Sequence, residues 1–467
     1  MKANYTICSS LAFLLMCSYA VCLGASEQPK DEAVGIVLDI LRSDDQEMQA
    51  AAIAMVKEMP GTQVTEALAK ELPKLSAKSQ VQLLSALGDR GDAAARPAVV
   101  DAVKSEEKSV RIAALRALGQ LGDDSSVELL AQAAAGTAGA EQKAARDSLY
   151  RLRGPNVDEV ILTGIPNAEA GKKVELISSV GQRNITAGVA ALLETAKDSD
   201  RDVRIESLRV LKVVAGPEHL PALVELLIKA KSSSDRTEAQ KTIAAVAHRI
   251  EDKSRQAASV LAVLPSVKET VARCSLLNVL GRIGDNSALP VLAAALKDEN
   301  IDIQTAAIRA LADWPTPEPV EELLKVAENS SNNVHGILAL RGFVRLLGLA
   351  SDRPADQTIE MYKKAISLAP DAGEKKKVLS GLSNTKSLAA MQMAAGYLDD
   401  ESLFVEAGTA VINIAAGIYA DYPEQAKDML NRIIKTTKND SLRQQAQELI
   451  NKVEQGDAGW QVDENEN

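Results

Sequence analysis

Apolar residues recur along most of the chain at the three- and four-residue spacing of amphipathic helices. One such helical face is formed by Val110, Ala113, Ala114, Ala117 and Leu118. A glycine and an aspartate follow, and a second apolar helix is expected after this turn, as at residues 125–135 and 287–297. Runs of alternating β-branched and aromatic residues, which are typical of strands, are scarce. The pattern predicts an all-α protein made of helix pairs.

A short phrase marks the end of the first helix in several pairs. It is ALGDRGD at residues 86–92, ALGQLGD at 117–123 and VLGRIGD at 279–285, and its first glycines Gly88 and Gly119 are 31 residues apart. Eight residues before this mark stands a long side chain with nitrogen donors: Gln49, Gln80, Arg111, Gln142, Lys173, Arg204, Arg236, Arg273 and Gln304. One residue before it stands an apolar side chain: Val56, Leu87, Leu118, Leu149, Val180, Leu211, Ile243, Leu280 and Leu311. Self-similarity at this period is the mark of a repeat protein.

One helix pair cannot bury its apolar face alone, so such pairs stack on their neighbours. The predicted fold is therefore a right-handed α-solenoid of about twelve stacked helix pairs. The nine donors, which we call the donor column, would form a ladder between repeats. We expect them to reach carboxylates such as Asp92, Asp123 and Asp285, or the carbonyl groups of the turns. Such bonds would set the angle between repeats more than they add net stability.

The segment from Val110-Arg111 through Ala117-Leu118-Gly119-Gln120-Leu121-Gly122-Asp123, followed by an Ala/Leu-rich helix, resembles the short HEAT-like repeat. This form occurs in phycobilisome lyases and in many exported bacterial proteins of unassigned role. The resemblance is clear over about residues 30–330 and looser up to about 455. It implies an architecture but says almost nothing about biochemical activity, because the family includes scaffolds, lyases and hydroxylases.

The chain divides into four regions by pattern. Residues 1–26 are expected to form a signal peptide and residues 30–345 the regular array. His335 continues the donor column, and less regular helical repeats are then expected to continue the solenoid over 346–455. Residues 456–467 form an acidic tail that we expect to be disordered.

The first 26 residues predict export to the periplasm or secretion. Lys2 is the lone charge before Glu27, and the apolar stretch ends in the small residues Gly24-Ala25-Ser26, which suit a signal peptidase. The alternative is an uncleaved membrane anchor, because an uncharged run of this length could span a bilayer. Three of the four cysteines lie in this segment, so Cys274 would be alone after cleavage and no intramolecular disulfide could form.

The charge pattern argues against a nucleic-acid partner. The formal net charge is −11, whereas phosphate binding needs a basic face. Aromatic residues make up only 3% of the chain, which suits a core of closely packed Ala and Leu helices.

No residue pattern points to catalysis, a metal or a cofactor. His219, His248 and His335 are far apart in sequence, and none has another histidine three or four residues away. HEAT-like iron hydroxylases carry repeated His-Glu dipeptides, and this chain has none. Cys274 lies on a predicted first helix and is expected to be a small buried packing residue. Phosphate-binding glycine loops, Gly-x-Ser-x-Gly and His-Glu-x-x-His are also missing from the sequence.

We therefore expect a monomeric, non-catalytic scaffold or adaptor of the cell envelope that binds protein. In HEAT-like arrays the second helices line the concave side, which makes Arg96, His219, Glu225 and Lys229 candidate contact residues. The alternative is an accessory module of an exported enzyme system that acts on carbohydrate or redox partners.

Overall fold

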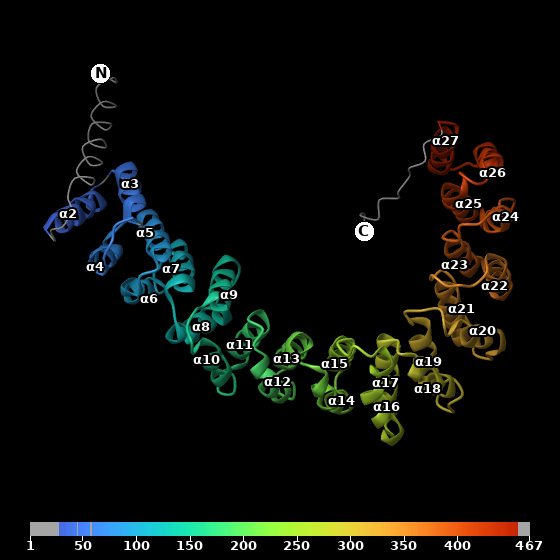
Figure 1. Ribbon diagram of the computed structural model, residues 1–467, viewed down its shortest axis with the longest axis horizontal. Coiled ribbons are helices and arrows are strands. Elements are labelled where there is room, and N and C mark those ends of the chain that lie inside the picture. Colours follow the sequence, from blue (N-terminus) through green and yellow to red (C-terminus); the bar gives the residue numbers. More distant parts are fainter. Residues whose placement is uncertain (1–27, 44, 57, 456–467) are drawn as a thin grey trace. The chain divides into compact units, whose positions relative to one another are not determined.

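The computed structural model describes residues 28–43, 45–56 and 58–455, and every regular element in these ranges is a helix (Figure 1). The predicted signal segment at 1–26 and the acidic tail at 456–467 lie outside the described residues. None of the described helices combines the length and the apolar composition needed to cross a membrane.

The described chain alternates between two kinds of helix. The first helices are α3 (Gln46–Val56), α5 (Ala77–Arg90), α7 (Lys108–Leu121), α9 (Ala140–Arg151), α11 (Ala170–Gln182), α13 (Arg201–Val214), α15 (Ser233–Ala247), α17 (Thr270–Ile283), α19 (Ile301–Ala312), α21 (Asn333–Leu347), α23 (Ala372–Leu382) and α25 (Phe404–Ile418). The second helices are α4 (Thr62–Glu71), α6 (Arg96–Ala102), α8 (Val127–Gly136), α10 (Val157–Gly164), α12 (Val189–Thr195), α14 (Leu220–Lys229), α16 (Ala258–Val263), α18 (Leu289–Ala295), α20 (Val320–Asn329), α22 (Ala355–Leu368), α24 (Leu388–Ala395) and α26 (Pro423–Thr436). These make twelve pairs, with α2 (Gln28–Arg42) before them and α27 (Asp440–Gln455) after them.

Short 3-10 turns accompany several second helices. They are η1 (Leu72–Lys74), η2 (Ala93–Ala95), η3 (Asp124–Ser126), η4 (Thr186–Gly188), η5 (Pro217–His219), η6 (Lys253–Arg255), η7 (Leu264–Ser266) and η8 (Asn286–Ala288). Asp92, Asp123 and Asp285 cap η2, η3 and η8 by accepting the backbone N–H of the second residue of the turn. The prediction that an aspartate starts the second helix of a pair is confirmed at these three positions.

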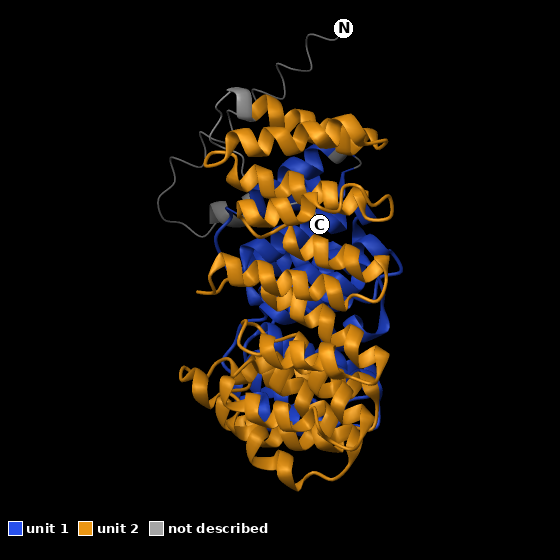
Figure 2. Cartoon of the chain, turned by 90° about the vertical axis from the view of Figure 1, so that its right-hand side faces the viewer, with its two compact units in different colours: residues 1–214 blue, residues 215–467 orange. Residues whose placement is uncertain are grey.

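The chain folds as two compact units, one up to Val214 and one from Ala215 (Figure 2). In unit 1, α5 packs on α7, α7 on α9 and α11 on α13. In unit 2, α15 packs on α17, α17 on α19 and α19 on α21. Most second helices pack against the first helix that follows them, as α8 does on α9 and α20 on α21. Each unit is therefore a double layer of helices, and the predicted all-α solenoid of about twelve pairs is confirmed.

The apolar position of the repeat forms the centre of the core. All nine residues predicted there, from Val56 to Leu311, are 0% exposed. Each is the tenth or eleventh residue of its first helix, where it is enclosed between the neighbouring first helix and the second layer. Burying one such side chain contributes about 1.5–3 kcal/mol.

The glycines of the repeated phrase serve two different purposes. Gly91 and Gly284 end their helices in the left-handed conformation, with φ of 72° and 71°, as a turn glycine should. Gly281, by contrast, lies inside α17, and a Cβ there would come within 2.6 Å of the Cα of Ala310 on α19. A glycine at the marked position thus lets consecutive first helices approach closely, a role that the turn interpretation missed.

Each unit, taken by itself, bends so that the first helices lie on the inner side and the second helices on the outer side (Figure 1). The expectation that the second helices line the concave side is therefore wrong for both units. Close contacts such as those at Gly119 and Gly281 shorten the spacing between first helices, and the more closely spaced layer lies inside the bend.

Candidate protein-binding surface

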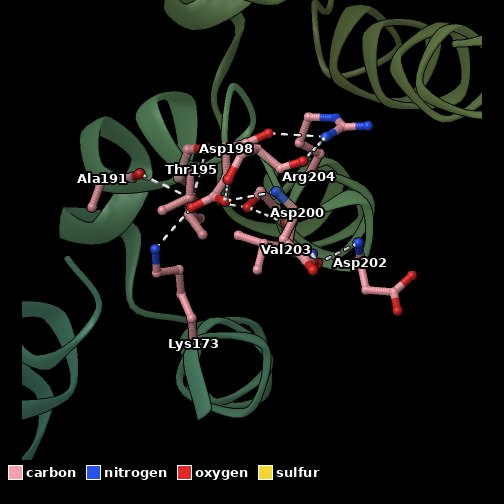
Figure 3. Close-up of polar contacts among 11 residues, drawn as sticks. Lys173, Ala191, Thr195, Asp198, Asp200, Asp202, Val203 and Arg204 are labelled. Carbon is pink, nitrogen blue, oxygen red and sulfur yellow. Dashed lines mark hydrogen bonds and ion pairs between the residues drawn. The ribbon is translucent and has the colours of Figure 1, made fainter. Parts of the chain in front are cut away.

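The surface of the inner layer is held in place by junctions between repeats, and the turn between α12 and α13 shows how they work (Figure 3). Lys173 on α11 donates to the Asp198 carboxylate at 2.8 Å, and that carboxylate also accepts the backbone N–H of Asp200 at 2.9 Å. Arg204 donates to the carbonyl groups of Asp198 and Ser199, both at 2.9 Å. The Lys173 ammonium lowers the pKa of Asp198, with help from the backbone bond. One turn thus joins three helices of unit 1.

Unit 2 repeats this junction with different residues. Arg273 on α17 donates to the Asp298 carboxylate at 2.9 Å, which also accepts the backbone N–H of Asn300 at 2.9 Å. Gln304 then donates to the carbonyl of Asp298 at 2.7 Å. Because a glutamine takes the place of Arg204, the carbonyl contact needs an N–H donor and not a positive charge.

Most members of the predicted donor column contact carbonyl groups near the end of the preceding helix, whereas Lys173 and Arg273 donate to the carboxylates of Asp198 and Asp298. Each member is the third or fourth residue of a first helix, a place from which a side chain can lean back toward the end of the preceding helix. Carbonyl acceptors are Leu41 and Ser43 for Gln49, Leu75 for Gln80, Ser105 and Glu106 for Arg111, Ala134 for Gln142, and Ala230 for Arg236. His335, by contrast, pairs with the Thr305 hydroxyl at 2.8 Å. Asp92, Asp123 and Asp285, the expected carboxylate targets, instead cap the second helices.

A further set of arginines ties first helices together and was not predicted. Arg90, Arg183 and Arg345 each lie ten residues after a member of the donor column and reach the end of the preceding first helix. Their carbonyl acceptors include Val56 at 2.8 Å for Arg90, Leu152 at 2.8 Å for Arg183, and Ala312 at 2.6 Å for Arg345. The sequence does show an arginine recurring at this position of the repeat, but it occurs in only three repeats.

Four arginine–glutamate pairs join successive helices of one layer. They are Arg42–Glu71, Arg111–Glu141, Arg146–Glu175 and Arg341–Glu374, each with two hydrogen bonds between the guanidinium and the carboxylate. The arginine in each pair is the main reason that the pKa values of Glu71 and Glu374 fall to about 2 and that of Glu141 is lowered. These glutamates are buried, so their charges are stable only while the pairs are intact.

The residues proposed as concave contacts are on the outer layer and are occupied locally. Arg96 donates to the Leu121 carbonyl at 3.0 Å and to the Asp123 carboxylate, which links two repeats. The His219 Nδ1 accepts the backbone N–H of Gly216 at 3.1 Å at the start of its turn. Glu225 and Lys229 pair with each other along α14.

The remaining candidate side chains have structural surroundings. His248 lies within hydrogen-bonding distance of the Ile283 carbonyl, at 3.0 Å from its Nε2. Cys274 is partly exposed rather than enclosed, and partial burial raises the pKa of its thiol. Among the described residues, histidines, cysteines and carboxylates do not gather in groups of three that could hold a metal ion.

The two layers of unit 1 differ in charge. Each first helix from α5 to α13 holds more basic than acidic residues, whereas α4, α8, α10 and α12 hold more acidic than basic ones. Arg116 on α7 and Arg209 on α13 occupy the same place in the repeat, five residues after the donor column, and both are exposed. The inner layer of unit 1 is therefore cationic from α5 to α13, in a chain whose net charge is −11. We call the exposed side of its helices α7, α9, α11 and α13 the inner face.

Two segments match a known family. Residues 65–149 and 257–341 match the family model for HEAT repeats. No curated protein matches the chain.

Solved structures with a similar fold include karyopherins. Kap121p bound to Pho4p has a TM-score of 0.54 and 11% identity, and the match covers 92% of this chain and 54% of that one. The karyopherin Kap121p bound to the extreme C-terminus of the protein phosphatase Cdc14p has a TM-score of 0.55 and 12% identity, over 91% of this chain and 54% of that one. This chain thus spans about half the length of the structures that it resembles. It is an α-solenoid in which residues 65–149 and 257–341 are similar to HEAT repeats.

Proposed function

We propose that the protein is an exported, non-catalytic scaffold or adaptor of the cell envelope that binds another protein through the inner face of unit 1. The observation that carries this proposal is the cationic inner face, which the ladder of junctions holds in fixed geometry. A surface built on packed helices loses little conformational entropy when a partner binds. Two solved structures of Kap121p, which has a similar fold, are complexes with proteins.

The charge of the inner face favours a partner with an acidic surface. Complementary charges speed the encounter of two proteins and exclude wrong partners. The acidic second layer and the net charge of −11 disfavour a nucleic acid, which needs an extended basic footprint.

Affinity capture from an envelope fraction tests the binding function. The full chain should recover a specific protein, and the double variant Arg116→Glu/Arg209→Glu should lose it. The matched control is Lys104→Glu/Lys197→Glu, which makes the same charge change on the exposed outer layer of unit 1. Equal recovery by both double variants would remove the inner face from the proposal.

Fractionation of cells tests the export function. A C-terminally tagged full chain should appear in the periplasm or the medium with its first residues removed, and mass spectrometry of its N-terminus would show the cleavage. Retention of intact chain in the cytoplasm would contradict export.

A further inference from the structure

A pocket of about 500 Å³ opens between α21 and α23, in the first-helix layer of unit 2. Its apolar wall includes Leu340, Val344 and Val378, and its rim carries Ser380 and Asn384. This volume lies within the range of about 300–1,000 Å³ that is usual for ligand sites. The pocket therefore offers both a sheltered floor and polar groups at its mouth.

The charged residues of the pocket are three cations and one carboxylate. Arg341, Arg345 and Lys377 line it together with Glu374. Glu374 is buried and accepts hydrogen bonds from Arg341 at 3.0 and 2.5 Å and from Lys377 at 2.8 Å. Arg345 donates to neutral acceptors, the carbonyls of Ala312 and Trp314. A surplus of two positive charges is left in the pocket.

These cations keep N–H groups for a ligand. Arg341 uses its Nε and Nη2 on Glu374, Arg345 uses its Nε and Nη2 on the carbonyls, and Lys377 uses one of three ammonium protons. The Nη1 groups of both arginines and two protons of Lys377 remain. All three side chains belong to residues that are exposed to solvent. A ligand can therefore reach charged donors without breaking the bonds that hold Glu374.

Negative groups around the pocket offset part of this surplus. Glu374 and, beyond it, the nearby Asp371 carboxylate raise the pKa of Arg341. The C-terminal ends of α21 and α23 also lie at the pocket and contribute about half a negative charge each. Tyr362, whose hydroxyl donates to the pocket carbonyl of Gly381 at 3.0 Å, has its pKa raised to about 12 by burial. Arg353 is close enough for its charge to oppose that rise, and its buried Nη1 has no hydrogen-bond partner. A fourth cation thus lies near the pocket.

A second pocket shows that this charge is particular to the first. A space of about 650 Å³ in unit 1 lies between α4 and α6, in the second-helix layer. Its charged residues are Glu66, Lys70, Asp101 and Lys104, so its two signs balance. The charges of that pocket therefore favour neither an anionic nor a cationic ligand.

We propose that the pocket between α21 and α23 binds the acidic side chains, Asp or Glu, of an extended segment of a protein partner. Arginine forks and ammonium groups suit carboxylates, and the apolar wall suits the aliphatic part of such a side chain. This inference deepens the proposed function, on which it rests for the protein nature of the ligand, and it adds a second contact site in unit 2.

Fluorescence anisotropy with two labelled peptides tests this site on the full chain. One peptide alternates Glu and Ser, and the other alternates Gln and Ser. The Glu peptide should bind at least about tenfold more tightly, and the difference should shrink as salt is raised. Equal affinity for the two peptides would overturn the proposal.

Four variants locate the binding. Ser380→Glu and Lys377→Glu place a negative charge in the pocket and should each weaken binding of the Glu peptide by about tenfold. The controls Ser367→Glu on α22 and Lys325→Glu on α20 make the same changes at exposed positions of the outer layer and should alter it by less than about twofold. If the controls weakened binding equally, the peptide would be held by the general electrostatic potential of the protein and not by this pocket. Lys377→Arg should restore binding.

Other ligands and the captured partner complete the test. Tighter binding of duplex DNA than of the Glu peptide, or displacement of that peptide by equimolar inorganic phosphate, would overturn the proposal in favour of another anion. A Ser380→Glu chain that still captures the natural partner undiminished would end the pocket proposal and leave the scaffold function standing. Specific peptide binding without any captured protein would support the pocket and count against the scaffold function.

Discussion

The regular array from α3 to α21 and the C-terminal helices from α23 to α27 differ in what they keep of the repeat. The buried apolar position persists through both. It is occupied by Leu382 in α23, Ile414 in α25 and Ile450 in α27, which are the eleventh residues of their helices and between 0% and 4% exposed. The donor position is kept as Lys375 in α23 but is lost in α25, which has Ala407 there.

The donor then returns in the last helix. Arg443 is the fourth residue of α27 and donates at 2.5 Å to the carbonyl of Thr437, six residues earlier, as Gln304 does to Asp298. Counting in steps of 31 from His335 does not reach Arg443, so its place in the column was missed. The comparison teaches that stacking needs the buried apolar position, whereas a helix pair can do without the junction bond. The place of the donor is set by where its helix begins, not by a fixed spacing in the sequence.

The largest effect should follow from removing the shared core position in either region. Leu118→Ala and Ile414→Ala should each destabilise the protein by about 2–5 kcal/mol, because both side chains are fully buried and leave a cavity. Urea unfolding followed by circular dichroism measures this loss. The exposed control Arg116→Ala should change stability by no more than about 0.5 kcal/mol. If Ile414→Ala left the stability almost unchanged, the core position would not play the same part in the two regions.

Crowding the contact between first helices should have the next largest effect. Gly281→Ala places a Cβ 2.6 Å from the Ala310 Cα, a backbone atom that cannot rotate away, and should cost about 1–3 kcal/mol. Gly35→Ala in α2 is the matched control, since its Cβ would meet nothing within 4 Å, and it should stabilise the helix by up to about 1 kcal/mol. Similar unfolding midpoints for both variants would mean that the inner layer can relax.

The pair that joins α21 to α23, across the border between the two regions, should make stability depend on acid. The pKa of Glu374 is about 2 in the folded protein and about 4.5 in its ordinary state, because Arg341 holds the carboxylate. Its contribution is therefore complete above about pH 4.5 and is lost as the pH falls toward about 2. Glu374→Gln should cost about 1–2 kcal/mol at neutral pH and should lose less further stability in that acid window. If the stability of the original protein and that of the Glu374→Gln variant fell in parallel with pH, this account would be contradicted.

The smallest effect should come from replacing Arg443, the donor of the last helix. Arg443→Ala should cost about 1 kcal/mol by leaving the Thr437 carbonyl without this bond, and Arg443→Gln should lose less than half of that, because Gln304 makes the same contact through an amide. Hydrogen exchange of the α27 amides gives a local measure. If glutamine were as harmful as alanine, the contact in α27 would depend on charge, unlike its counterpart in α19.

The sequence alone was sufficient for the helix pairs, their number and the buried column, because helical periodicity and local turn residues carry that information in short stretches of chain. It also indicated the donor column and the capping of second helices by Asp92, Asp123 and Asp285, although it offered these aspartates as partners of the donor column too. Tertiary structure decided which layer lies inside the bend, since that depends on how closely Gly281 lets two helices approach. It likewise decided that Arg341, Arg345, Glu374 and Lys377 share one pocket. Long-range packing sets such encounters, and no periodicity in the sequence records which side chains will meet.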